Sequence, residues 1–352
     1  MGKLVLLAAA FGSGVLDAAL TAASALVVGS PLVAPWERRH EAQRAHRALA
    51  EELVVGGLSC SDVLAAVQAY REWELLAGRE ATAFCRKHFL RHATLVEIAE
   101  TKGQLLDLLD EAGLLPEACR AQRPGSRPKS RQAWGWEGRG RSGQEEGSRQ
   151  GAPRQREGAV GGAAAVQLVP RRCSEGGVRG RPLSAATLSS ILAGLLCACL
   201  WPQVALVVPK ATLLAEMGHR GCVGPVEFFV HNAECGPAAL VPVQIHPSSV
   251  SAREKVFGSP FLLYHELART ARLYARGVTP VPPLALALFA GALSQAAGAE
   301  AAAAGGGAAV LVLGACVRLT MKAWACRCVL AIRARLDSLW QASLAGRGSC
   351  AV

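Results

Sequence analysis

A long polar segment divides this sequence into two parts that can fold. Residues 120–181 are rich in Gly, Arg, Gln and Ser and contain few large apolar side chains. Such a segment cannot bury enough apolar surface to offset the conformational entropy lost when it becomes ordered. The sequence therefore predicts a disordered Gly/Arg-rich linker over residues 116–182, with folded material on both sides of it.

Composition supports several folded domains and an anionic partner. The chain has 352 residues, and its 51% of hydrophobic residues can supply real cores. The formal net charge of +11 favours an anionic partner without choosing between RNA, DNA and a membrane surface. The twelve cysteines show no disulfide-like spacing. Reduced thiols in a cytoplasmic or nuclear protein are therefore predicted in preference to a secreted disulfide scaffold.

The first part has the periodicity of a helical bundle. Ser61 and Asp62 precede apolar residues at helical spacing and are typical of a helix start, because their side chains cap free N–H groups. Two more helices are predicted over residues 81–90 and 94–111, and Gly113 is a natural stop for the second of them.

The second part combines an apolar helix with short strands. Residues 184–200 predict a core helix, because the run is too short to span a bilayer comfortably. Arg272, Tyr274 and Arg276 would share one face of a strand, since strand side chains alternate. Such a face suits phosphates and stacked bases. Two more strands are predicted, over residues 204–208 and 261–265.

Residues 294–352 are predicted to contain a low-complexity segment and then a basic helix. The residues from 299 to 309 are nearly all Ala and Gly, and apolar residues from Val317 onward suggest an amphipathic helix that carries several arginines. A membrane span here and a signal peptide at the N-terminus are less favoured alternatives. Glu300 and several glycines interrupt the apolar run near the C-terminus, and Asp17 follows the apolar run at the N-terminus.

Ordered motifs in both parts resemble one family. The stretches "SDVLAAVQAYREW" and "KGQLLDLLDEAGL", followed by "IHPSSV", "SPFLLYHE" and "RTARLYAR", are similar to the C-terminal region of DEAH/RHA RNA helicases. The resemblance implies an α+β multidomain chain without RecA-like motor domains. It places a helical ratchet-like domain at residues 1–115, and an OB-like β-barrel at residues 183–293 that is followed by a trailing helix.

The resemblance also implies where RNA would be contacted. One group of candidates lies on a loop that matches a family position near the RNA path; its members are His246, Ser248 and Ser249. The other group lies on or beside matching strands; its members are Tyr264, Arg269, Thr270, Arg272, Tyr274 and Arg276. As an alternative, Tyr264 and His265 would pack the barrel, and Arg276 would pair with an acid of the helicase core.

No catalytic motif accompanies these candidates, and no catalytic or metal-binding residue is predicted. The chain has no Gly-x-x-x-x-Gly-Lys-Ser/Thr loop, and Asp110-Glu111-Ala112-Gly113 lacks the histidine of a DEAH box. ATP and Mg²⁺, which the parent family uses, therefore have no predicted site here. One set has residue types that suit zinc, although strand and loop positions are the favoured interpretation: His219, Cys222, His231 and Cys235.

The predicted function is that of an accessory RNA-binding region of a DEAH/RHA-type ATP-dependent RNA helicase. It would clamp single-stranded or structured RNA, with the RecA-like core supplied in cis by the rest of a longer protein, of which this chain would be a fragment, or in trans by a partner. No membrane partner is expected. The alternatives are a freestanding, non-enzymatic RNA-binding or helicase-regulating protein, and a membrane-associated or secreted protein.

Overall fold

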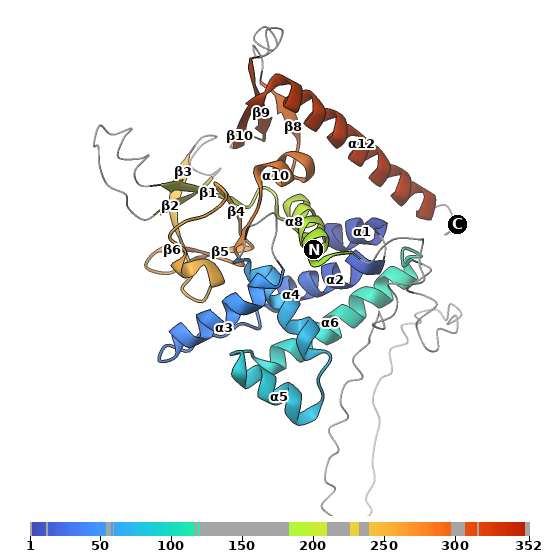
Figure 1. Cartoon of the computed structure of the whole chain (residues 1–352). Coiled ribbons are helices and arrows are strands. Elements are labelled where there is room, and N and C mark those ends of the chain that lie inside the picture. Colours follow the sequence, from blue (N-terminus) through green and yellow to red (C-terminus); the bar gives the residue numbers. More distant parts are fainter. Residues whose placement is uncertain are drawn as a thin grey trace, which may run out of the picture.

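The described part of the chain contains a group of helices, a curled sheet, a second small sheet and a long helix near the C-terminus (Figure 1). The computed structural model describes residues 2–11, 13–53, 58, 60–116, 119, 183–209, 226–231, 239–296, 307–314 and 317–348. The helices of the first group are α1 (Gly2–Phe11), α2 (Ser13–Val28), α3 (Arg39–Glu51), α4 (Asp62–Trp73), α5 (Gly78–Lys87) and α6 (His92–Glu111).

Local signals place the helix ends where the sequence predicts them. The Oγ of Ser61 accepts a hydrogen bond from the N–H of Leu64 at 3.1 Å, which caps the start of α4. Ser184 caps α8 (Ala185–Leu200) in the same way, through the N–H of Thr187 at 3.1 Å. Gly113 follows α6 with a φ of +71°, the left-handed conformation that ends many helices.

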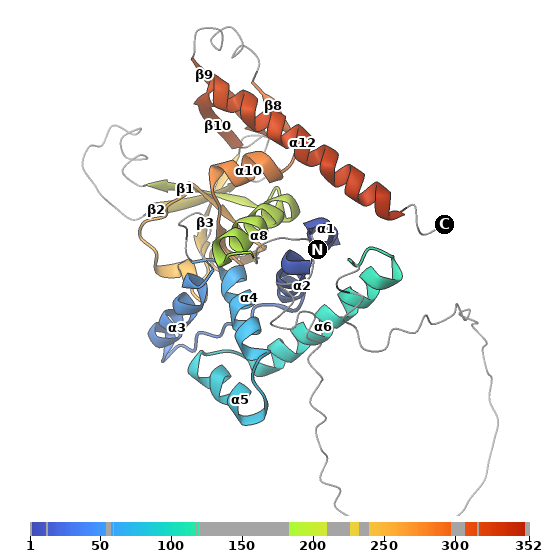
Figure 2. The same cartoon turned by 45° about the vertical axis from the view of Figure 1, so that its right-hand side comes forward.

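Helix α8 joins the two parts of the molecule, because one hydrophobic core surrounds it. Its side chains Leu192, Leu195 and Leu196 are fully buried among residues of α1, α2, α10 (Pro283–Phe289) and the terminal elements. Figure 2 shows α8 between the sheet and the α1–α2 pair. At the contact with α10, a Cβ on Gly194 would come within 2.8 Å of Phe289, so this position needs a glycine for the two helices to approach.

The sheet of the second part curls around its own core. Its strands follow the order β5-β6-β3-β2-β1-β4-β7, and β3 with β6 is the parallel pair. Core residues come from strands spread across this order: Ala205, Val230, Val243, Leu262 and Ala275. The strands are β1 (Val204–Pro209), β2 (Val226–His231), β3 (Leu240–Ile245), β4 (Phe261–Leu263), β5 (Glu266–Arg269), β6 (Leu273–Arg276) and β7 (Thr279–Pro280).

This curled sheet confirms the predicted OB-like fold, and seven described strands form it. The predicted strands over residues 204–208 and 261–265 are present as β1 and β4. The predicted alternation also holds in β6, where Ala275 faces the core and Arg276 is exposed.

The C-terminal prediction is correct for the helix and wrong for the residues before it. Helix α12 (Ala323–Gly348) is present, but Val317 and Leu319 lie on a strand. Apolar and polar residues alternate from Val317 to Lys322, so one side of the strand is buried and the other exposed. This second sheet has the order β10-β9-β8; its members are β8 (Leu293–Gln295), β9 (Ala308–Leu313) and β10 (Val317–Lys322).

Aromatic contacts and one arginine fix α12 to the body. The ring of Trp340 lies 6.4 Å from that of Phe11 in α1 and 5.8 Å from that of Phe289 in α10. Arg333 donates hydrogen bonds to the carbonyl oxygens of Ala287 at 3.2 Å and Gly291 at 3.0 Å. A cation at these carbonyls also stabilises the C-terminal end of the α10 dipole. Within the described ranges, no helix is long and apolar enough to cross a membrane.

A buried charge cluster links α2, α4 and α6. The Nζ of Lys102 lies 2.8 Å from a carboxylate oxygen of Asp17 and 3.6 Å from one of Glu74, and its side chain is only 2% exposed. The same ammonium lies 4.7 Å from the ring centroid of Tyr70, whose hydroxyl donates to Glu74. Removing the ammonium group would leave the carboxylates of Asp17 and Glu74 without a counter-charge in a poorly solvated site.

We expect Lys102→Met to lower the free energy of unfolding by about 3 kcal/mol, because it breaks a buried ion pair by removing one partner. Urea unfolding followed by circular dichroism measures this. The matched control is Lys87→Met at an exposed position of α5. Equal stability of the two variants would show that the cluster contributes nothing beyond a surface pair.

Candidate nucleic-acid interface

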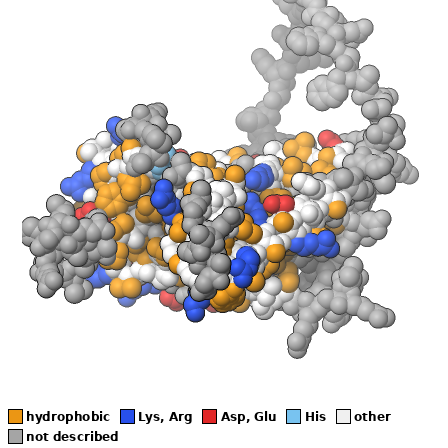
Figure 3. Space-filling view, turned by 90° about the horizontal axis from the view of Figure 1, so that it is seen from above, with side chains coloured by type: hydrophobic (Ala, Val, Ile, Leu, Met, Phe, Trp, Pro, Cys, Tyr) orange, Lys and Arg blue, Asp and Glu red, His pale blue; other side chains and the backbone are white. Residues whose placement is uncertain are grey.

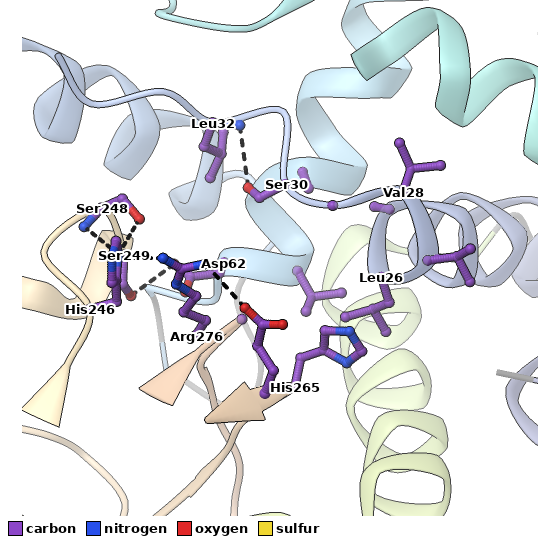
Figure 4. A pocket seen from close by; sticks show the side chains of 17 residues that line it. Leu26, Val28, Ser30, Leu32, Asp62, His246, Ser248, Ser249, His265 and Arg276 are labelled. Atoms are coloured by element: carbon purple, nitrogen blue, oxygen red, sulfur yellow. Dashed lines mark hydrogen bonds and ion pairs between the residues drawn. The ribbon is translucent and has the colours of Figure 1, made fainter. Parts of the chain in front are cut away.

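A pocket lies where the helical part meets the sheet (Figure 4). One wall is apolar and comes from the C-terminal end of α2 and from α4, including Leu26, Val28 and Ala66. The other wall is polar and comes from the loop after β3 and from β5 and β6. This polar wall contains Glu266 and four of the predicted contact residues, namely His246, Ser248, Ser249 and Arg276.

The loop after β3 is shaped by its own histidine. The Nδ1 of His246 lies 2.6 Å from the Oγ of Ser248 and accepts from the backbone N–H of Ser248 at 3.2 Å. Proline at position 247 keeps His246 extended, which lets the ring fold back over the turn. Tyr274 of β6 meets the ring edge-on, with the centroids 5.8 Å apart. The parallel pairing of β3 with β6 brings these two residues together.

Arg276 connects the loop to β5. Its guanidinium lies 3.2 Å from a carboxylate oxygen of Glu266 and 3.2 Å from Nε2 of His246 (Figure 4). The N–H of Ser248 needs the lone pair of Nδ1, which an imidazolium lacks, so the arrangement favours a neutral imidazole. A neutral imidazole has one unprotonated nitrogen, so the contact of Arg276 with Nε2 is not an accepted hydrogen bond in the same tautomer. Burial first, and then the nearby charges of Arg276 and Arg39, lower the pKa of His246. At neutral pH the pocket therefore carries an uncharged histidine beside the ion pair of Arg276 and Glu266.

Asp62 holds two loops of the sheet against the start of α4. One carboxylate oxygen accepts from the hydroxyl of Ser249 at 2.9 Å and from the N–H of Val250 at 2.8 Å. The other oxygen accepts from the N–H of Val278 at 2.9 Å. The backbone N–H of Asp62 in turn donates to the carbonyl of Val278 at 2.9 Å. The carboxylate is therefore shared by three donors from segments far away in the sequence.

Further polar contacts surround Asp62. The hydroxyls of Ser61 and Thr279 lie 2.8 Å apart, and Ser251 donates to the carbonyl of Cys60 at 2.6 Å. The side-chain amide of Gln43 in α3 donates to the carbonyl of Pro247 at 3.0 Å. These contacts attach the His246 loop to α3 and α4 at several points. We refer to residues 60–62 with the loops that they hold as the Asp62 junction.

Burial and hydrogen bonding act on Asp62 in opposite directions. Removal from water disfavours the charged carboxylate, whereas the bonds from Val250, Val278 and Ser249 favour it. Burial is the larger effect and raises the pKa of Asp62 to about 6. The junction therefore contains a carboxyl group that titrates unusually close to neutral pH.

The strand candidates lie in two different environments. Arg269, Thr270 and Arg272 surround the turn between β5 and β6, where all three are exposed. A backbone bond from Thr270 to Arg272 at 2.9 Å closes this turn. Arg272 also lines a groove along β2 and β3, together with Phe228 and Gln244. This hairpin tip is distinct from the pocket of His246 and Arg276.

Two candidates serve the packing of the fold. The side chain of Tyr264 is 7% exposed and packs in the core of the curled sheet, as the alternative interpretation predicts. Ser249 is 4% exposed, and its hydroxyl donates to Asp62 and accepts from the N–H of Ser251. Both side chains therefore offer little surface to a ligand.

Sequence reasoning missed the role of two pocket residues. Asp62 is predicted only as part of a helix start, whereas its carboxylate accepts hydrogen bonds from loops 187 to 216 residues farther along the chain. Glu266 is not among the candidates at all, yet it pairs with Arg276. A usable signal was the capping serine at position 61, because it left the next acidic side chain free for a longer-range role.

Other predicted sites fall partly outside the described residues. Three of the four zinc candidates do so, namely His219, Cys222 and Cys235, as does almost all of the predicted linker. Within the described ranges, no cluster of three or more His, Cys, Asp and Glu residues could hold a metal ion. Free thiols in the described ranges include Cys85, Cys197, Cys199, Cys326 and Cys328.

Two family models match the regions on either side of the linker. The helicase associated domain (HA2), ratchet-like, matches residues 1–89, and the oligonucleotide/oligosaccharide-binding (OB)-fold matches residues 192–293. The first match covers most of the helices that support the pocket, and the second covers the curled sheet. Together they define a helicase-associated module: a helical domain of the HA2 type combined with an OB-fold.

Several relatives that match most of the chain are named as RNA helicases. DHX57 of Mus musculus, named as an ATP-dependent RNA helicase, is 30% identical over 297 residues, which is 83% of this chain and 18% of that protein. DExH-box ATP-dependent RNA helicase DExH1 of Arabidopsis thaliana is 26% identical over 294 residues, 83% of this chain and 21% of its own length. ATP-dependent RNA helicase DHX29 of Homo sapiens is 26% identical over 300 residues, which is 83% of this chain and 16% of that protein.

The chain belongs to the DEAH/RHA family of RNA helicases and corresponds to the C-terminal part of its members. It spans about a fifth of the length of the curated relatives that it matches.

We expect Asp62→Asn to lower the free energy of unfolding by about 1–3 kcal/mol, because an amide nitrogen cannot accept the N–H of Val278 and leaves a buried donor unpaired. The variant should also lose a pH dependence. The folded-state pKa of Asp62 lies above the ordinary carboxyl value, so its stabilising contribution is complete below about pH 4 and is lost as pH rises through about 6.

Urea unfolding between about pH 4 and pH 7 tests both parts, and the stability gap between wild type and Asp62→Asn should narrow as pH rises. Glu97→Gln, at an exposed position of α6, is the matched control. A gap that stays constant over this range would contradict the pKa assigned to Asp62.

We expect Arg276→Ala to raise the pKa of His246 part of the way back to its usual value. The arginine charge opposes protonation of the ring, but burial, the larger cause, remains. NMR titration of the imidazole resonances measures the shift, with Arg272→Ala as the control. An unchanged pKa would mean that Arg276 and His246 do not interact in solution.

Proposed function

We propose that this chain is an accessory RNA-binding region that clamps a single RNA strand for a DEAH/RHA helicase motor. The observation that carries the proposal is the exposed pair Arg269 and Arg272 at the hairpin tip, on an OB-like sheet whose relatives are named as RNA helicases. Guanidinium groups bind phosphate oxygens through paired N–H donors, which makes arginine well suited to an RNA backbone.

The hairpin tip would supply backbone contacts. Arg269 and Arg272 have no ion pair within the part of the chain that the structure describes, so both charges can meet a phosphate without first leaving a carboxylate. The groove beside Arg272 offers Phe228 and Gln244 as further contacts for a strand that leaves the tip. Contacts of this kind position a strand without reading its sequence.

The pocket would supply a second and more selective contact. The imidazole of His246, the hydroxyl of Ser248 and the guanidinium of Arg276 lie close together there, and Tyr274 packs against the His246 ring. Single-stranded RNA presents unstacked bases and phosphates that such groups recognise. The Asp62 junction would keep this loop in place while the strand is under load, because it fixes the loop to the helical domain.

The motor would lie outside this region. The proposal assigns ATP and Mg²⁺ to RecA-like domains, present either in the same polypeptide or in a partner, and assigns no catalytic step to the residues described here. In this arrangement the region acts on RNA only by holding it. A cytoplasmic or nuclear location would suit such a role.

We expect the double variant Arg269→Ala plus Arg272→Ala to bind a labelled single-stranded RNA at least about tenfold more weakly than wild type, because two charge-assisted contacts are lost. The slope of log affinity against log salt should fall by about 1.4, at about 0.7 per phosphate contact on a single strand. Fluorescence anisotropy across a salt series measures both quantities.

Arg318→Ala plus Arg327→Ala is the matched control, since it removes two exposed arginines from β10 and α12 and should leave binding unchanged. Wild-type protein that fails to bind RNA at low salt would refute the clamp. An equal loss of RNA affinity in the two double variants would show that binding depends on the overall positive charge and not on the hairpin tip.

A further inference from the structure

An exposed apolar stripe runs along the outer side of α12. Trp324 is 61% exposed, Ile332 50% and Leu339 51%, and Cys328 between them is exposed as well. Their spacing of four, four and seven residues places them on one face of the helix, over a length of about 22 Å at 1.5 Å per residue. We call Trp324, Cys328, Ile332 and Leu339 the α12 stripe.

The α12 stripe points away from the contacts that hold the helix. The face toward the body carries Cys326, Val329, Arg333 and Trp340, which contact the hydrophobic core, α1 and α10. Figures 1 and 2 show α12 running along the outside of the molecule from the second sheet toward the C-terminus. Of the residues that the structure describes, none buries the stripe. A helix with two apolar faces, one packed and one exposed, is typical of a helix that binds a second partner.

The charges around the α12 stripe are all of one sign. Arg335 lies within it, between Ile332 and Leu339, and the exposed Arg327 flanks it. The acidic residue of the described helix is Asp337, which lies on the other side and pairs with Arg333. Figure 3 looks down on the molecule from above, where basic side chains and a few acidic ones stand among hydrophobic ones. An occupant therefore has to supply apolar side chains and carboxylates together.

We propose that the α12 stripe binds an acidic amphipathic helix of another protein. Such a helix would place its own apolar side chains between Trp324, Ile332 and Leu339 and a carboxylate against Arg335. This surface would recruit a protein partner, so the proposal goes beyond the clamping of RNA and does not depend on it.

Other occupants fit the charges less well. In a symmetric pair of two copies the same patch faces itself, which would bring Arg327 and Arg335 near their own counterparts. A lipid surface would have to cover Arg335, which lies in the middle of the stripe, without a carboxylate to pair it. Aliphatic side chains such as Ile332 and Leu339 do not stack on bases, which argues against RNA. The Arg-rich residues 120–181 do not complement the charge either.

The test uses the full chain and a labelled synthetic peptide of about three heptads, with leucine at positions a and d and glutamate at e and g. We expect Ile332→Glu plus Leu339→Glu to weaken peptide binding at least tenfold, as measured by fluorescence anisotropy. The matched control is Ala334→Glu plus Gln341→Glu, at exposed positions beside the stripe, which should leave binding unchanged. Equal melting temperatures of the variants would show that the fold is retained.

Charge exchange identifies the carboxylate contact. Arg335→Glu should lose affinity for the glutamate peptide and gain affinity for a peptide with lysine at the same positions, which a purely apolar surface would not do. Arg269→Ala plus Arg272→Ala should bind the glutamate peptide like wild type. Failure of this proposal is thereby separated from failure of the RNA clamp.

Several outcomes would overturn the proposal. One is the absence of peptide binding up to about 100 μM, and another is equal binding by the stripe variant. A wild-type dimer in sedimentation that the stripe variant abolishes would assign the stripe to a second copy. Binding to phosphatidylserine vesicles, or a loss of RNA affinity in the stripe variant, would assign it to a lipid surface or to RNA.

Discussion

The hydrogen bonds of the Asp62 carboxylate hold together the two halves of the site. A single side chain at the start of α4 accepts from the loop after β3 and from the link between β6 and β7. Without these bonds, the hydroxyl of Ser249 and the N–H groups of Val250 and Val278 would be buried with no acceptor. Closely packed side chains keep water away from this boundary, so water could not replace the carboxylate. The position of His246 relative to the helices is therefore a consequence of where one carboxylate lies.

The Asp62 junction differs in kind from the contact around α8. Around α8 the helical part and the sheet share an apolar core, which is tolerant of small shifts because it has no directional bonds. At Asp62 they share hydrogen bonds, which specify distance and angle. The apolar contact supplies most of the cohesion between the parts, and the polar contact supplies their alignment. This division places the geometric precision next to the pocket, where a ligand would need it.

Sequence patterns predicted the elements well and the contacts between them poorly. The helix starts at Ser61 and Ser184 were predictable because a cap is a local interaction. The Asp62 contacts were not, because their donors follow it by 187 to 216 residues and only the fold brings them near. Residues 317–322 were predicted to be helical although they form β10, because Val317 and Leu319 were grouped with the helical positions that follow them. Their spacing of two residues fits a strand. The candidates for RNA contact came from family motifs, and a motif does not show that Tyr264 and Ser249 face inward.

The place of α8 in the chain has a consequence for how the polypeptide can be divided. Helices α1 and α2 lie before the long Gly/Arg-rich stretch and α8 lies after it, yet all three contribute to one interior. A backbone cut between α6 and α8 would therefore leave two fragments, each of which exposes part of the apolar core that they share. The connection between them contributes proximity, and the specificity of their association resides in the buried leucines and alanines that they share.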